Sequence, residues 1–64
     1  MREHILEQIT QMLVAMGYQW REAKDAVYRH EELIREEYED RMHEMPVIAM
    51  AVDAAEARQV LEAS

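Results

Sequence analysis

A helix that ends in a sharp turn is indicated by residues 5–20, which read ILEQITQMLVAMGYQW. Apolar side chains recur in this stretch at steps of three and four, the spacing of one face of an α-helix. The members of this stripe are Ile5, Leu6, Ile9, Met12, Leu13 and Met16. Gly17 follows the last of them, and glycine readily adopts the left-handed conformation that ends many helices. We therefore predict a helix over residues 2–16 that ends at Gly17.

A second apolar stripe begins after this turn and continues at helical spacing toward Pro46, the only proline. Its members are Trp20, Ala23, Val27, Ile34, Tyr38, Met42 and Met45, with His30 or Glu31 at the gap. No glycine or proline interrupts this segment, so the pattern predicts one helix from about residue 20 to Pro46, roughly 39 Å long. The first helix is only about 22 Å long by the same rise per residue. This difference predicts a long central helix on which two shorter helices pack.

The C-terminal part of the chain offers the third helix. Asp53 is a residue type that caps helix N-termini, and Ala57, Val60 and Leu61 form a short apolar stripe after it. Residues 47–52 are a continuous apolar run in which Val and Ile favour extended structure while Ala and Met favour a helix. This segment stays open as helix, strand or loop. The expected fold is a single all-α domain over residues 1–64, a helical hairpin plus a C-terminal helix, as a monomer or a dimer.

Small size favours self-association. A domain of 64 residues buries only about 60% of the surface that its unfolded chain exposes, and this chain has no cysteine with which to form a disulfide. A second subunit is then the favoured source of additional stability. We predict a homodimer whose seam uses one side of the long helix. Its candidate residues are Val27, Ile34, Tyr38 and Met42.

The charge balance excludes some classes of partner. The formal net charge is −7, from 14 acidic and 7 basic residues, so nucleic-acid phosphates and anionic membrane surfaces repel the chain as a whole. We therefore expect no direct nucleic-acid binding and no membrane association. No apolar run approaches the roughly 18 residues that span a bilayer, and Glu3, His4 and Glu7 interrupt any signal-peptide core. These features predict a cytoplasmic protein.

Residues 31–44 hold seven acidic side chains and two arginines. On a helix, Glu32, Glu36 and Glu39 lie opposite the apolar stripe, as does His43, and this is the ordinary pattern of a solvated face. The alternative is an acidic face that imitates the phosphates of DNA and occupies the basic site of a nucleic-acid-binding protein. The candidate residues for such a face are Glu32, Glu36, Glu39 and Asp40.

Neither catalysis nor metal binding is predicted. Thr10 and Ser64 are the only serine or threonine residues, and neither has an activating partner close in sequence. Glu39 and His43 have a four-residue spacing that places two ligands on one helical face, but diiron-type bundles use a Glu-x-x-His step that this chain lacks. We expect no enzyme activity, no metal and no cofactor.

The stretch Met16-Gly17-Tyr18, with the apolar residues on either side of it, resembles the first half of a ubiquitin-associated domain and the related C-terminal module of the bacterial Holliday-junction protein RuvA. The resemblance covers residues 5–27. It implies a Met-Gly-aromatic loop that docks a protein partner. An uninterrupted helix as far as Pro46 departs from that family, whose second helix is shorter. In the alternative interpretation, Gly17 caps the first helix and its neighbours pack a helical corner.

A binding role is what these exclusions leave. We predict a helical adaptor or inhibitor of another protein, and composition also resembles that of small bacteriophage proteins that block host enzymes. The candidate partner-binding residues are Met16, Gly17, Tyr18 and Trp20. Trp20 is the only tryptophan, and tryptophan often anchors protein interfaces. The DNA mimic is the second hypothesis, and a self-assembling bundle with no other partner is the third.

Overall fold

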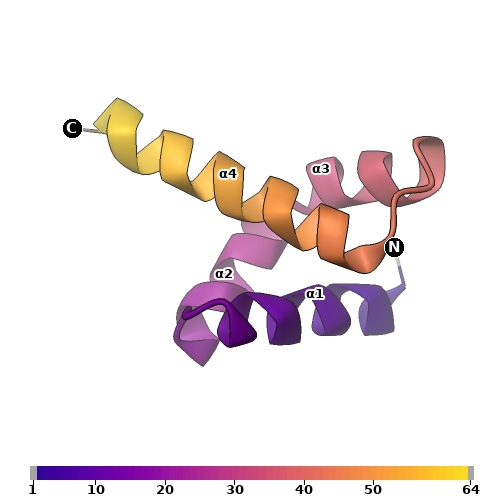
Figure 1. The fold of residues 1–64 in the computed structure, drawn as a ribbon, viewed down its shortest axis with the longest axis horizontal. Helices are drawn as coiled ribbons and strands as arrows, with labels where there is room; N and C mark the ends of the chain where they lie inside the picture. The colour runs from indigo at the N-terminus through magenta and orange to yellow at the C-terminus, as the bar shows by residue number, and fades with distance from the viewer. Residues whose placement is uncertain (1, 64) are drawn as a thin grey trace.

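The computed structural model describes residues 2–63. Its elements are α1 (Glu3–Ala15), α2 (Trp20–Arg29), α3 (Glu31–Arg35), a π-helical turn η1 (Glu36–Asp40) and α4 (Met45–Ala63). No strand occurs in this part of the chain, so the predicted all-α class is confirmed. In Figure 1, α1 and α2 meet at a corner and α4 crosses the molecule above α1, with its C-terminal end projecting at the left. The main packing contacts join α1 to α2 and α1 to α4.

Helix α1 ends at the predicted glycine. Gly17 has a φ of 115°, which only glycine adopts without strain. The Gly17 amide donates to the Val14 carbonyl at 3.0 Å, and the Tyr18 amide donates to the Leu13 carbonyl at 3.1 Å. This pair of bonds is the Schellman motif, which satisfies carbonyl groups that the end of a helix leaves unpaired. The predicted helix and its cap are confirmed to within a residue at each end.

The predicted long central helix is wrong. Helix α2 ends at Arg29, and His30 leaves the helical conformation with a φ of −108° and a ψ of 29°. The chain resumes as α3 and then widens into η1, where the Arg41 amide donates to the Glu36 carbonyl at 3.1 Å. A straight helix of roughly 39 Å would also exceed the longest dimension of the molecule, 32 Å between Cα atoms. The break keeps both halves of the segment against one core.

Helix α4 settles the conformation of residues 47–52, which are helical. Pro46 lies in the first turn of α4, where its missing N–H removes no helical hydrogen bond. Ile48 and Val52 are fully buried in the core, and this burial outweighs their preference for strands. The predicted N-cap at Asp53 is wrong, because that residue lies in the middle of the helix.

One hydrophobic core joins the four α-helices. It consists of Ile5, Leu6, Ile9, Leu13, Ala23, Ala26, Val27, Ile34, Ile48, Ala49 and Val52. Of the four predicted dimer-seam residues, Val27 and Ile34 have no exposed surface, and Tyr38 packs partly buried against the core. Only Met42, which is 83% exposed, offers a large free surface. A homodimer stays a prediction, but Val27 and Ile34 cannot form its seam because their own chain already covers them.

Glu56 of α4 contacts the two residues at the break between α2 and α3, Arg29 and His30. Its carboxylate accepts two hydrogen bonds from the Arg29 guanidinium, at 3.0 and 3.2 Å, and lies 2.7 Å from Nε2 of His30. Burial by itself raises the pKa of Glu56, but the hydrogen bonds from Arg29 and His30 outweigh burial and hold this pKa below its ordinary value. The ionised form is therefore the one that stabilises the fold.

We expect Glu56→Gln to lower the free energy of unfolding by about 1 kcal/mol at neutral pH. Because the pKa is depressed in the folded state, this stabilisation is present above the unfolded pKa and is lost as the pH falls through the folded pKa. Urea denaturation of both proteins at neutral pH and well below pH 4.5 measures the difference. Glu62→Gln, on the exposed end of the same helix, is the matched control. An equal deficit at both pH values would show that the Glu56 charge is not involved.

Candidate functional site

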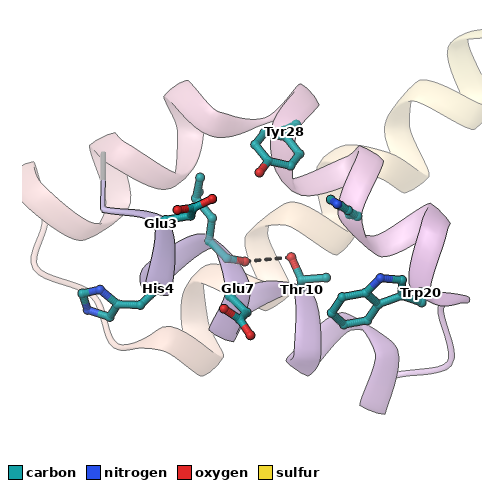
Figure 2. A pocket seen from close by; sticks show the side chains of 8 residues that line it. Glu3, His4, Glu7, Thr10, Trp20 and Tyr28 are labelled. Carbon is teal, nitrogen blue, oxygen red and sulfur yellow. Dashed lines mark hydrogen bonds between the residues drawn. The ribbon is translucent and has the colours of Figure 1, made fainter.

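A groove of about 420 Å³ lies between α1 and α2. It is lined by Glu3, His4, Leu6, Glu7 and Thr10 of α1 and by Trp20, Lys24 and Tyr28 of α2. The α2 residues are spaced by four, so they lie on one face of that helix. Trp20 and Tyr28 are 53% and 51% exposed, and Figure 2 shows the Trp20 ring beside Thr10. The groove therefore has two aromatic walls on its α2 side.

Thr10 and Leu6 close the bottom of this groove. Both are buried, and the Thr10 hydroxyl donates to the Leu6 carbonyl at 2.7 Å, the dashed line in Figure 2. A threonine bonded in this way directs its proton into its own helix rather than toward a bound molecule. The Thr10 hydroxyl is thus not available to a bound molecule, and the polar groups that can contact one lie on the two rims of the groove.

Charge differs between the two rims. Glu3 and Glu7 stand on the α1 side, and Lys24 stands between the aromatic rings on the α2 side. All three are exposed, and none forms an ion pair with another residue of the described range 2–63. A rim with two uncompensated carboxylates attracts basic groups, and the aromatic faces accept apolar or cationic side chains.

The structure divides the predicted partner-binding residues between two sides of the α1–α2 corner. Trp20 enters the groove, and Met16 and Gly17 are exposed at the corner, Met16 by 46%. Tyr18 instead turns toward α4, where its hydroxyl donates to Oδ1 of Asp53 at 2.7 Å. Burial, together with this hydrogen bond, raises the pKa of Tyr18 to about 12. Tyr18 therefore fixes the corner to α4.

The four predicted acidic-face residues are all exposed on α3 and η1, but arginines lie among them. Arg35 Nη2 is 2.6 Å from Oε2 of Glu32, and Arg41 Nη2 is 3.2 Å from Oε1 of Glu36. These ion pairs lower the negative charge density below that suggested by the run of acids. The DNA-mimic role stays a prediction, and no feature of this surface favours it over a solvated face.

Of the eight residues that line the groove, only Trp20 is among the predicted partner-binding residues. Tyr28 and Lys24 were assigned no role, although both follow Trp20 at steps of four and so share its helical face. The apolar stripe through Trp20, Ala23 and Val27 hides this signal, because Lys24 and Tyr28 lie outside that stripe. The structure places Ala23 and Val27 in the core and leaves Trp20 53% exposed.

Three further observations concern metal sites, membrane spans and similarity to known proteins. Within residues 2–63, no group of three or more metal-ligating side chains could hold a metal ion, and no helix is both long and apolar enough to cross a membrane. Comparisons with protein-family models, curated proteins and solved structures found no match.

Proposed function

We propose that this chain is a protein-binding module that receives a segment of another protein in the α1–α2 groove. The observation that carries the proposal is the pair Trp20 and Tyr28, two large aromatic side chains left half exposed along one concave surface. Burial of a large aromatic ring contributes more binding free energy than burial of most other side chains, and tryptophan and tyrosine dominate the binding energy of many protein interfaces. A protein segment that covers both rings would complete their burial.

The charges on the rims favour a particular kind of segment. Glu3 and Glu7 line the α1 side, and the whole chain has a formal net charge of −7. A segment with apolar anchors and at least one lysine or arginine beside them complements this groove. A short amphipathic helix has this composition, and the negative field of the chain accelerates its association.

Binding of this kind makes the protein an adaptor or an inhibitor, because the segment in the groove is withdrawn from its other contacts. Met16, which is 46% exposed at the α1–α2 corner, offers a further apolar side chain there. The same corner holds the Met-Gly-Tyr stretch that resembles the docking loop of ubiquitin-associated domains. The exposed aromatic pair and this stretch both support a contact at the junction of α1 and α2.

Selection of peptides from a random displayed library tests the proposal without knowledge of the natural partner. We expect the selected peptides to converge on apolar anchors flanked by basic residues. Trp20→Ala is expected to weaken their binding at least about tenfold, because a truncated interface tryptophan typically costs 2 kcal/mol or more. Fluorescence polarisation of a labelled peptide measures the affinity.

Met42→Ala is the control for this experiment, because Met42 is an apolar residue that is 83% exposed and lies outside both α1 and α2. Its affinity for the peptides is expected to equal that of the unmodified chain. Peptides that do not converge, or that bind Trp20→Ala as tightly as the unmodified chain, would contradict the groove as the binding site.

A further inference from the structure

The outer side of α4 carries an apolar stripe that the core does not use. Its members, which we name the α4 seam, are Val47, Met50, Ala54, Ala57 and Leu61. They are spaced by three, four, three and four residues, which is the a and d pattern of a coiled coil. The core-facing residues Ile48, Ala49, Val52 and Ala55 lie on the opposite side of the helix. Helix α4 is therefore apolar on two opposite faces, and its own chain covers one of them.

Every residue of the α4 seam is exposed. Val47, Met50 and Leu61 are 46%, 64% and 74% exposed, and the two alanines are exposed as well. The outer face of a surface helix normally carries charged residues. Between Met45 and Ala57 the only charged residues are Asp53 and Glu56. Asp53 accepts a hydrogen bond from Tyr18, and Glu56 contacts Arg29 and His30. The seam itself thus contains no charge.

Helix α4 also continues past the body of the molecule. All residues from 57 to 63 are exposed, and Figure 1 shows this yellow segment projecting from the other helices. A helical end with little packing gains little stability in water, because helix formation depends on length and on packing of an apolar face. A partner along the seam would supply that packing at Leu61.

We propose that the α4 seam pairs with the α4 seam of a second copy of this chain, in parallel and in register. This surface is separate from the α1–α2 groove, behind which α4 passes in Figure 2. The seam supplies the same a and d positions to both helices, so its pattern is complementary to itself. Ala54 and Ala57 lie at its centre, where small side chains let two helices approach closely.

Charges beside the seam select a second copy and set its direction. Asp53 occupies position g and Arg58, five residues later, occupies position e of the next heptad. In a parallel pair, g of one helix faces this e of the other, so each Asp53 faces Arg58 of the second copy. Tyr18 occupies only Oδ1 of Asp53, and Arg58 forms no ion pair within residues 2–63. An antiparallel pair places g beside g and e beside e, and the two charges do not meet.

Sedimentation equilibrium of the full chain from micromolar to millimolar concentration tests the proposal. We expect the mass to rise from 7.6 kDa toward twice that value. Met50→Glu places two carboxylates against each other in the seam, and it is expected to keep the chain at 7.6 kDa over the whole range. Met42→Glu makes the same substitution on a methionine that is 83% exposed but outside the seam, and it is expected to dimerise like the unmodified chain.

The direction of pairing has its own test, because the chain has no cysteine. In a parallel, in-register pair, the cysteine of Val47→Cys forms a disulfide with the same cysteine of the second copy in a glutathione redox buffer. The cysteine of Leu61→Cys does the same. In an antiparallel pair, two copies of either cysteine lie roughly 20 Å apart, too far for a disulfide. Circular dichroism checks that each variant stays helical. A chain that is monomeric at millimolar concentration, a dimer that tolerates Met50→Glu, or cysteines that do not cross-link would each overturn the proposal.

Discussion

Leu13→Ala is expected to lower the free energy of unfolding by about 3 kcal/mol, the largest effect of any single substitution proposed for this chain. Leu13 has no exposed surface, so its truncation leaves a cavity where α1 meets the rest of the core. Its carbonyl also accepts the Tyr18 amide in the cap of α1, so movement of the backbone to fill the cavity would strain that bond. A 64-residue domain has roughly 3–10 kcal/mol of total stability, so this loss leaves a large unfolded fraction.

Leu61→Ala is the matched control, since it removes the same atoms from a side chain that is 74% exposed. At a concentration where the chain is monomeric, we expect it to change stability by less than about 0.5 kcal/mol. Thermal and urea unfolding followed by circular dichroism measure both values. Similar losses for the two variants would contradict the assignment of Leu13 to the core.

The second largest effect on stability is expected from Gly17→Ala, which should lower the free energy of unfolding by about 1–2 kcal/mol. A Cβ built at Gly17 meets no atom within 4 Å, so crowding contributes nothing. The cost comes from the backbone alone, because a φ of 115° is unfavourable for an L-residue.

D-alanine at the same position is the sharpest control for Gly17→Ala, and a chain of 64 residues is short enough for chemical synthesis. A D-residue favours positive φ, so the synthetic chain is expected to be about as stable as the original. Both variants add one methyl group to the Cα of residue 17, with opposite configuration. Equal destabilisation by L- and D-alanine would show that space, rather than backbone conformation, selects glycine at this turn.

Local patterns sufficed for α1 and the turn that follows it. The stripe through Ile9 and Leu13 and the glycine after Met16 are signals within one helix and its cap, and the structure confirms both. The break at His30 depends instead on Glu56, which is 26 residues away in sequence. No glycine or proline marks the break, and only the gap in the apolar stripe near His30 hinted at it.

Helix α4 was obscured by two ambiguous signals. A proline can mark the end of the preceding helix or the first turn of the following one. In the prediction from sequence, Pro46 marks only the end of the second helix. Asp53 has the side chain of an N-cap but uses it to accept a hydrogen bond from Tyr18. With the helix placed after Asp53, the regular spacing from Val47 to Leu61 could not be recognised. Once α4 is known to begin at Met45, the sequence alone shows the three- and four-residue spacing of the α4 seam.

The order of the helices along the chain has a consequence for how the protein folds during synthesis. Helices α1 and α2 are neighbours in sequence, so their corner can form as soon as they leave the ribosome. Helix α4 contacts α1 across a separation of 30 residues, from Ala15 to Met45. Until it arrives, the face of α1 that it covers stays open to water and to chaperones. Helix α4, which is made after α1, α2 and α3, thus converts an early hairpin with exposed apolar surface into a closed domain.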